Sequence, residues 1–490
     1  MKKIIFFLGL LCIALPSFFL IQADPDLWGH TQFGIDHIQN QHIASSDPYS
    51  FMTEGRAWVN HEWLTEFLFA KLYLANKGSG LFMLRGFVFA AMLVLFSILL
   101  LLHGRHELVT LVFLVFSVPV LGVLVNVRPH MFTALFTVFY LLTIQLYRRG
   151  QSWIIWSWPI VMAVWVNLHG GFVVGCMLLT LFWGLCFLKL ETERQHVLKK
   201  MSFALLLTFV ATLINPYGIG LHVYLLEALR LKREYITEWQ NLPQSAWYVY
   251  VLFCFIPLLL SVFKRKKIPL TESIVFVFTS VYAFFNSRLV VFLVLLSGII
   301  FVRAMGGLFE GTSDIRSRLS SVSTLLIVVI AVGMTGVSRG WNIAQQTGAN
   351  IRVNSNRYPV ESLRVLKNNQ WGKKMAVSFN WGEYAIWHLF PDYLVSVDGR
   401  YETVYDPSYV EKILKASAEG NAKEYLANVS PDVIWIESDR PLSLALENDL
   451  AWKLIYKDDV ASIFLPAEYQ PMPDSNQWTS ERSNALAVFP

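Results

Sequence analysis

Residues 4–34 read IIFFLGLLCIALPSFFLIQADPDLWGHTQFG, and this stretch decides how the chain is organised. It begins with an apolar run that can cross a bilayer, since a spanning helix needs about 20 such residues. Asp24, Asp26 and His30 follow directly, where a membrane helix leaves the lipid. Ionisable side chains at this depth are costly and often mark function. The same aspartates could instead be solvated or cap a helix.

The composition is that of a membrane protein with a soluble part. Of the 490 residues, 55% are hydrophobic and only 15% are charged, whereas soluble proteins have about 25% charged residues. The net charge of +5 does not imply a nucleic-acid partner, because Lys and Arg gather between membrane helices. The cysteines lie in apolar segments without metal-ligand spacing, so we expect no disulfides from Cys12, Cys176, Cys186 and Cys254.

Apolar runs continue to about residue 338 and predict about eleven spanning helices. We place them near residues 4–22, 81–102, 108–126, 131–147, 152–168, 171–189, 201–215, 246–263, 270–286, 289–305 and 320–338. The first run has a basic start and ends near the small residue Ala23, which fits either a cleaved signal peptide or a retained helix. We expect retention because other spans follow.

The loops between these spans differ in charge between the two sides. When the spans alternate, the basic loops, among them 264–267 and 313–318, fall on one side. The positive-inside rule makes that side the cytoplasm. Most of the acidic, histidine and amide side chains outside the spans therefore collect on the opposite, extracytoplasmic face.

The chain divides by pattern into a transmembrane domain, a soluble domain and a tail. Residues 1–338 form the transmembrane domain, with a long first extracytoplasmic loop at 23–80. Residues 339–466 alternate strand and helix patterns, which predict a small extracytoplasmic α/β domain. Residues 467–490 predict a flexible tail. The expected fold class is a mainly α polytopic membrane protein with a C-terminal α/β domain.

Two clusters of acidic and histidine side chains lie in the first loop. Asp24, Asp26 and His30 open it, and the motif NHEWLTE near its far end supplies His61, Glu62 and Glu66. A carboxylate can act as general base for a hydroxyl or amide nucleophile, or bind a divalent cation such as Mg²⁺ or Mn²⁺. Spacing does not choose between these roles, so a divalent cation stays an open alternative.

Basic and histidine side chains are expected at the same membrane face. Arg85, Arg128 and Arg288 fall near the outer ends of predicted spans. An arginine there can snorkel to the interface, pair with an acid, or bind an anion such as a lipid phosphate. His130 in VRPHMF and His169 in NLHGGF are further binding candidates. Each could equally be a structural histidine or part of a turn.

The order of these motifs resembles the GT-C superfamily of membrane glycosyltransferases, which use sugars carried on polyprenyl phosphates or diphosphates. DLWGHTQFG is similar to a loop of the protein O-mannosyltransferases, where Asp26 matches the catalytic aspartate but Leu27 replaces a neighbouring glutamate. HEWLTEFLFAKLYLANKGSGLFMLRG follows the layout of the lipid A aminoarabinose transferases. Arg85 matches an arginine there, whereas His61 and Glu62 replace a basic motif.

A third segment, FNWGE at residues 379–383, resembles in position the Trp-Trp-Asp-Tyr-Gly motif of oligosaccharyltransferases. It lacks the aspartate, so a peptide-sequon acceptor is not implied. The whole pattern looks like a bacterial branch of GT-C proteins. Asp398, Arg400 and Glu383 could lie at a ligand edge of the soluble domain or form fold-stabilising polar pairs.

The resemblance implies an inverting glycosyltransferase in a bacterial inner membrane. Its donor would be a polyprenyl-phosphate-linked sugar, and its acceptor an extracytoplasmic glycan, lipid or protein. Asp26, helped by Asp24, would be catalytic. Substrate-binding residues would be His30, His61, Glu62, Arg85, Arg128, His130, His169 and Arg288.

Two other functions stay open beside the enzyme. A lipid or solute transporter would need charged residues in mid-membrane, and the predicted spans contain few. A non-catalytic scaffold for envelope assembly would tolerate replacement of Asp26. Within the GT-C family, oligosaccharyltransferase-like members use a divalent cation, and O-mannosyltransferase-like members do not.

Overall fold

The computed structural model describes residues 2–104, 106–188, 190, 195–231, 233–264, 268–306, 322–369, 371–469 and 488–490. Of the segments named from sequence, residues 265–267 and 313–318 and most of the tail lie outside this part of the chain. The chain forms two compact units. The first comprises Met1–Ile21, Phe82–Ile219 and Ile236–Asn350; the second comprises Gln22–Leu81, Gly220–Tyr235 and Ile351–Pro490. The first loop therefore clusters with the C-terminal region, whereas the sequence division placed residues 23–80 with the membrane domain.

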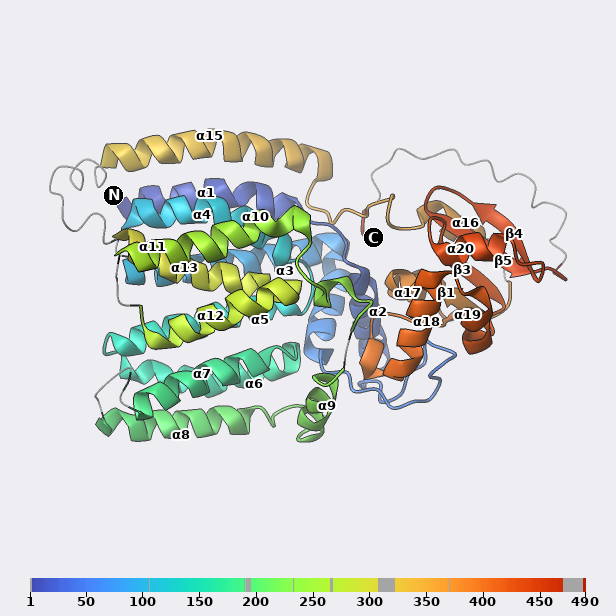
Figure 1. Ribbon diagram of the computed structural model, residues 1–490, viewed down its shortest axis with the longest axis horizontal. Coiled ribbons are helices and arrows are strands. Elements are labelled where there is room, and N and C mark those ends of the chain that lie inside the picture. Colours follow the sequence, from blue (N-terminus) through green and yellow to red (C-terminus); the bar gives the residue numbers. More distant parts are fainter. Residues whose placement is uncertain are drawn as a thin grey trace. The chain divides into compact units, whose positions relative to one another are not determined.

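The first unit is a helical bundle, seen in Figure 1. Its α-helices are α1 (Lys2–Phe19), the later part of α3 (Trp63–Gly104), α4 (Glu107–Leu124), α5 (His130–Arg148), α6 (Ser157–Leu168), α7 (Phe172–Phe187), α8 (Gln195–Ala211), α10 (Trp247–Tyr250), α11 (Ile256–Lys264), α12 (Leu270–Phe285), α13 (Val290–Gly306) and α15 (Val322–Thr347). Helix α1 packs against α4 and α15 and buries Phe6, Leu10 and Ile13.

The apolar runs predicted from sequence are helical in the structure. Among the described residues, seven helices are long and apolar enough to cross a membrane: Lys2–Phe19, Trp63–Gly104, Glu107–Leu124, His130–Arg148, Gln244–Lys264, Ser287–Gly306 and Leu325–Gln346. Three shorter apolar helices are Ser152–Leu168, Phe172–Phe187 and Leu270–Phe285. The protein is thus a multi-pass, mainly α-helical membrane protein, as predicted, although fewer helices than the expected eleven reach spanning length.

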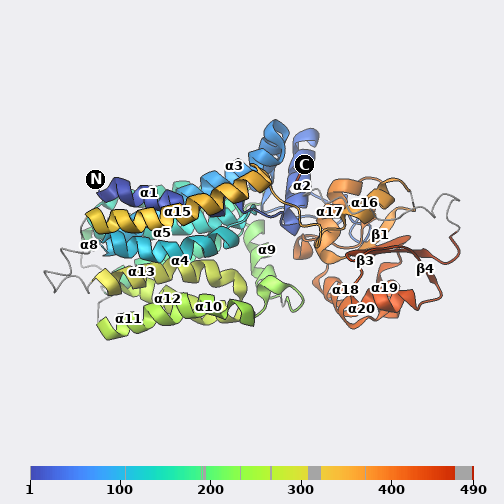
Figure 2. The same cartoon turned by 90° about the horizontal axis from the view of Figure 1, so that it is seen from above.

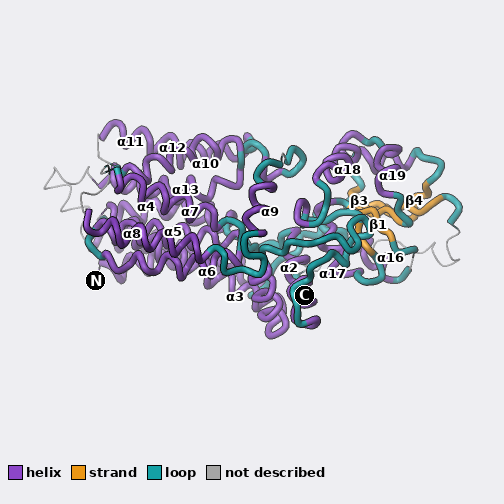
Figure 3. Tube along the Cα trace, turned by 90° about the horizontal axis from the view of Figure 1, so that it is seen from below, coloured by secondary structure: helices purple, strands orange, loops and turns teal. Residues whose placement is uncertain are grey.

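The second unit contains one mixed five-stranded sheet, drawn in orange in Figure 3. Its strands are β1 (Lys374–Val377), β2 (Leu394–Val395), β3 (Val433–Glu437), β4 (Trp452–Lys457) and β5 (Ala461–Pro466). The order is β2-β1-β3-β5-β4; β1 pairs in parallel with β2 and β3, and β5 pairs antiparallel with β3 and β4. Residues 433–436 of the central strand are fully buried, as expected for a strand covered on both faces.

Helices cover both faces of this sheet. Those that follow residue 351 are α16 (Val360–Lys367), α17 (Gly382–Leu389), α18 (Pro407–Glu419), α19 (Ala422–Val429) and α20 (Pro441–Glu447). Helices α16 and α17 lie on one face, and α18, α19 and α20 lie on the other (Figure 2). The predicted α/β pattern of the C-terminal region is therefore present. The unit also contains α2 (Pro25–Asn40), the start of α3, and α9 (Gly220–Ala228).

The first loop is built into this α/β unit. The N–H of Val395 in edge strand β2 donates to the carbonyl of Tyr49 at 3.0 Å, so the loop covers an edge that would otherwise expose unpaired backbone groups. The end of the chain is also held, because the N–H of Phe489 donates to the carbonyl of Ile351 at 2.9 Å and the Phe489 ring is buried. At residues 488–490 the tail is therefore packed, whereas residues 470–487 of the predicted flexible tail lie outside the described part of the chain.

Candidate functional site

The start of α2 fixes the position of Asp26. Asp24 is the N-cap residue, and its Oδ1 accepts a hydrogen bond from the Asp26 N–H at 3.2 Å. Pro25 takes a first-turn position where no backbone donor is needed. The structure therefore supports the capping alternative for Asp24, and Asp24 orients Asp26. Asp26 lies in the first helical turn, where the helix dipole favours a negative charge.

The carboxyl groups of Asp26 and Glu383 converge on Gly399. A Cβ atom at Gly399 would lie 2.6 Å from Asp26 Oδ1 and 2.7 Å from Glu383 Oε1, so a residue without a side chain is needed there. The other oxygen, Glu383 Oε2, accepts the Gly29 N–H at 3.1 Å. Burial raises the pKa of Glu383 well above its ordinary value, and the charges of Asp26 and Asp398 raise it further. Glu383, which is only 3% exposed, therefore favours the protonated form beside Asp26.

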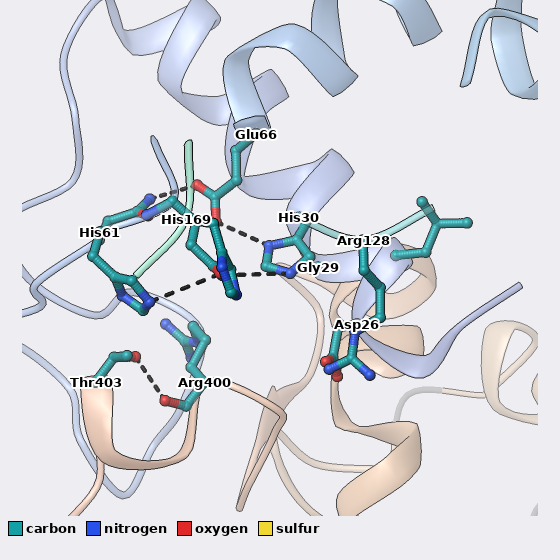
Figure 4. Close-up of polar contacts among 12 residues, drawn as sticks. Asp26, Gly29, His30, His61, Glu66, Arg128, His169, Arg400 and Thr403 are labelled. Carbon is teal, nitrogen blue, oxygen red and sulfur yellow. Dashed lines mark hydrogen bonds and ion pairs between the residues drawn. The ribbon is translucent and has the colours of Figure 1, made fainter. Parts of the chain in front are cut away.

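His30 lies on α2 one turn after Asp26 and faces Glu66 of the NHEWLTE motif (Figure 4). Glu62 of the same motif lies near its other ring nitrogen. Its Nδ1 lies 3.2 Å from Glu66 Oε1, and its Nε2 lies 3.7 Å from Glu62 Oε2. The Asn60 amide donates to the other oxygen of Glu66, which fixes that carboxylate. Burial alone would lower the pKa of His30, but the hydrogen bond to Glu66 and the charges of Glu62, Glu66 and Asp26 raise it. The cluster thus favours an imidazolium.

His61 extends this cluster. Its Nε2 lies 3.8 Å from Glu62 Oε1, and its ring packs 5.5 Å, centroid to centroid, from the ring of Tyr224 on α9. Within the second unit, His30 of the first predicted cluster is therefore connected to His61 of the second through the shared carboxylate of Glu62.

Arg400 lies at the centre of a buried ion-pair network. Its Nε and one terminal nitrogen donate to both oxygens of Asp398, at 2.8 and 2.7 Å, and its other terminal nitrogen donates to Asp47 at 2.7 Å. Tyr405 donates to Asp398 at 2.7 Å. The network joins the first loop to the segment after β2. Of the two alternatives for Asp398 and Arg400, the fold-stabilising one applies.

In the first unit, Arg128 and Arg288 both pair with Glu238, and we call these three residues the arginine cluster. Arg128 donates directly to Glu238 Oε1, and Arg288 Nε lies 3.5 Å from Glu238 Oε2. The Arg288 guanidinium also stacks 5.1 Å from the ring centroid of Trp239. Partial burial acts to raise the pKa of Glu238, but the charges of Arg128 and Arg288 outweigh it and lower the pKa. Glu238 is thus held as a carboxylate.

Arg85 has a different role from the one predicted. It is fully buried, and its guanidinium donates to the backbone carbonyls of Ser17, Gly122 and Val125 at 2.7, 2.6 and 2.9 Å. Its guanidinium also lies 4.3 Å from the ring centroid of Phe89. The residue joins helices of the bundle, so its geometry does not support the predicted contact with a lipid phosphate.

The two histidines of the first unit hold local backbone. His130 Nε2 donates to the carbonyl of Leu124 at 2.8 Å. His169 Nδ1 accepts the N–H of Gly171 at 2.9 Å, and the Thr133 hydroxyl lies 2.8 Å from the same nitrogen. These contacts favour the structural alternative for both side chains, since each stabilises the chain next to a helix start.

The structure places the ten predicted site residues in both units. The second unit holds Asp24, Asp26, His30, His61 and Glu62, and the first holds Arg85, Arg128, His130, His169 and Arg288. Three acids outside that set lie against members of it: Glu66 contacts His30, Glu238 pairs with both arginines, and Glu383 converges with Asp26 on Gly399. In the sequence, the FNWGE segment pointed to Glu383, whereas no sequence motif pointed to Glu238.

A divalent cation would need a cluster of ligand side chains. The described residues contain no group of three or more His, Cys, Asp or Glu side chains arranged to hold a metal ion. Asp24 serves as a cap, while His61 and Glu62 contact each other and are joined to His30 rather than to Asp24.

Comparison with known proteins places the fold. Neither a protein-family model nor a curated protein sequence matches this chain. The structure is similar to the archaeal oligosaccharyltransferase AglB from Archaeoglobus fulgidus, which was solved in complex with an inhibitory peptide and a dolichol-phosphate. The TM-score is 0.59 at 11% sequence identity, and the match covers 89% of this chain and 70% of AglB. It is also similar to ArnT from Cupriavidus metallidurans bound to undecaprenyl phosphate, at a TM-score of 0.53 and 12% identity, over 94% of this chain and 97% of ArnT. The chain therefore has the fold of AglB and ArnT.

Proposed function

We propose that the protein is a glycosyltransferase that moves a sugar from a polyprenyl-phosphate-linked donor to an extracytoplasmic acceptor. The observation that carries the proposal is the convergence of Asp26 and Glu383 on Gly399, which holds a carboxylate rigidly at the start of α2. The fold adds support, because solved proteins of this fold carry dolichol-phosphate or undecaprenyl phosphate. The acceptor is a glycan, lipid or protein, and the location is a bacterial inner membrane with the α/β domain outside the cytoplasm.

Asp26 is the general base of the proposed reaction. It takes the proton of the acceptor hydroxyl or amine, and the freed electron pair attacks the anomeric carbon opposite the phosphate. The bond between the anomeric carbon and the phosphate oxygen breaks, and its electrons leave with the lipid phosphate. A single displacement of this kind inverts the anomeric configuration.

Neighbouring side chains prepare Asp26 and the substrates for this step. Asp24 orients the first turn of α2, and protonated Glu383 adds no second negative charge beside Asp26. His30, whose two ring nitrogens face Glu62 and Glu66, positions these carboxylates beside the start of α2 and is not itself proposed to contact the substrate. These roles make Asp26 the one catalytic residue and the others positioning or binding residues.

Arg128 and Arg288 are the proposed phosphate ligands. Charge-assisted hydrogen bonds from guanidinium groups stabilise the charge that develops on a leaving phosphate. Both arginines belong to one cluster and are partly exposed, at 15% and 36% of their side-chain surface. Arg85 is not proposed as a phosphate ligand, because its guanidinium already donates to three backbone carbonyls.

The test is donor turnover by the purified full-length protein in nanodiscs. Undecaprenyl-phosphate-linked sugars are supplied with acceptor mixtures, and release of undecaprenyl phosphate is followed for wild type, Asp26→Asn and the exposed control Asp439→Asn. We expect turnover by wild type and the control, and a loss of at least about 100-fold in Asp26→Asn. Equal turnover by Asp26→Asn would remove Asp26 from the chemistry. If the protein is instead a non-catalytic scaffold, it will show no donor turnover, and cells that carry the Asp26→Asn variant will keep the function of the wild-type protein.

A further inference from the structure

A cluster of aromatic side chains joins the two helices that carry the acid pair. Trp28 lies on α2, two residues after Asp26, and its ring is buried. On α17, the rings of Tyr384 and His388 lie 4.9 and 5.2 Å from the Trp28 ring, centroid to centroid. Glu383 directly precedes Tyr384 on the same helix. The packing around Trp28 therefore holds the helix that carries one acid against the helix that carries the other.

The same cluster contains an aromatic side chain from the last described segment, residues 488–490. The Phe489 ring is 2% exposed, and its centroid lies 4.6 Å from that of Trp28 and 5.5 Å from that of Trp387 on α17. Its third neighbour is Tyr73 in the first part of α3, at 5.8 Å. Ring pairs at such separations attract one another beyond the gain from burial. Phe489 thus packs against α2, α3 and α17 at once.

Backbone contacts on both sides of Phe489 fix this segment. The N–H of Phe489 donates to the carbonyl of Ile351 at 2.9 Å, and the N–H of Gly78 donates to the carbonyl of Pro490 at 3.0 Å. A Cβ atom at Gly78 would lie 2.7 Å from the carbonyl oxygen of Phe489. A side chain at residue 78 would therefore push the segment away, because packed interiors leave little slack.

We propose that Phe489 is a positioning residue that fixes Asp26 by holding Trp28, and with it the start of α2, against α17. The inference rests on the proposed function, in which Asp26 is the general base. Loss of the Phe489 ring leaves a cavity beside Trp28, and the surroundings of such a cavity relax in part. The movement reaches Asp26 through the first turn of α2. The proposed phosphate ligands, Arg128 and Arg288, belong to the other unit, so donor binding should persist.

A purely structural role for Phe489 would give a different result. If the ring only stabilises the α/β unit, its removal lowers the melting temperature but leaves the kcat of the folded protein unchanged. If the ring positions Asp26, kcat falls in the folded protein while the donor KM is kept. Ile413 supplies a matched control, because it is buried in the same unit on α18, which lies on the opposite face of the sheet from α17 (Figure 2).

The experiment measures kcat and donor KM for release of undecaprenyl phosphate from an undecaprenyl-phosphate-linked sugar by the full-length protein in nanodiscs. Phe489→Ala removes the ring, and Phe489→Leu keeps most of its apolar volume. Gly78→Ala displaces the segment at its backbone and removes no polar group. Ile413→Ala is the control. A thermal melt of each protein sets the assay temperature well below the lowest midpoint.

We expect Phe489→Ala to lower kcat by about 10-fold and to change the donor KM by less than about twofold. Phe489→Leu should recover at least about half of the wild-type kcat, and Gly78→Ala should lower kcat without raising KM. Ile413→Ala should melt earlier than wild type and keep its kcat.

A folded Phe489→Ala protein with wild-type kcat, or an equal loss of kcat in the Ile413→Ala control, would overturn the inference and leave the proposed function intact. If Phe489→Ala does not fold, Gly78→Ala decides by the same readout, and wild-type kcat in that variant would overturn the inference. Absence of donor turnover by the wild-type protein would instead contradict the proposed function itself.

Discussion

Replacement of Gly399 by alanine tests the geometry of the acid pair without removing any polar group. The added methyl carbon would lie 2.6 Å from Asp26 Oδ1 and 2.7 Å from Glu383 Oε1, where ordinary contact begins at 3.4 Å. Each oxygen must therefore retreat by roughly 0.7 to 0.8 Å, or the backbone must shift, because packed interiors leave no slack. The φ angle of Gly399 is outside the left-handed region, so alanine adds crowding rather than backbone strain.

The added methyl group should lower both the folding free energy and the reaction rate. Overpacking of a buried site costs about 1–3 kcal/mol of folding free energy, which lowers the melting temperature without unfolding the protein at assay temperature. A displacement approaching 1 Å of a reacting group can cost about 100-fold in rate. We therefore expect Gly399→Ala to lower kcat by about 10- to 100-fold, with little change in the donor KM.

The assay is release of undecaprenyl phosphate by the protein in nanodiscs, with a thermal melt of each sample. Gly184→Ala is the matched control, because a Cβ at this α7 glycine meets nothing within 4 Å. The control should keep wild-type kcat. A folded Gly399→Ala protein with wild-type kcat would show that the position of Asp26 against Gly399 does not matter for the reaction.

Three further predictions concern stability and metal dependence. Arg400→Gln leaves Asp47 and Asp398 buried without their cation, so we expect it to lower the free energy of unfolding by about 3–5 kcal/mol, measured by denaturant titration in detergent; a loss below about 1 kcal/mol would contradict the network. The pKa of His30 is raised in the folded protein, so protonated His30 stabilises the folded state. This contribution is complete below the unfolded pKa of about 6.5 and disappears as pH rises through the folded pKa. The difference in melting temperature between wild type and His30→Gln should therefore be larger at about pH 6 than at about pH 9, and an equal difference at both would count against it. Since the described residues hold no metal-ligand group, EDTA should change turnover by less than about twofold; loss of turnover restored by Mg²⁺ or Mn²⁺ would contradict this.

Local patterns in the sequence predicted most of the fold. Apolar runs marked the helices of the bundle, and the alternation of strand and helix patterns over residues 339–466 marked the C-terminal α/β domain. Patterns of this kind report burial within one element. They carry no information about which distant elements pack together, so the joining of the first loop to the C-terminal region was not foreseen.

In the candidate site, too, local sequence patterns identified individual residues but not the distant residues that contact them. Asp24, Asp26 and His30 could be singled out because they follow an apolar run directly, and the capping alternative for Asp24 was already visible in the sequence. Arg400 and Asp47 are 353 residues apart, and no spacing rule links them. Glu238 likewise meets the arginines only through the tertiary fold. Side chains brought together by long-range packing have no local signature, which is why their partners required the structure.

The most direct test of the account separates binding from chemistry in one set of proteins. Undecaprenyl phosphate binding and donor turnover are measured side by side for wild type, Asp26→Asn and Arg288→Gln. We expect Asp26→Asn to bind the lipid like wild type while losing at least about 100-fold of turnover, and Arg288→Gln to lose binding. If Asp26→Asn turns over donor at the wild-type rate, or if Arg288→Gln binds the lipid as wild type does, the assignment of acid and phosphate ligand is contradicted.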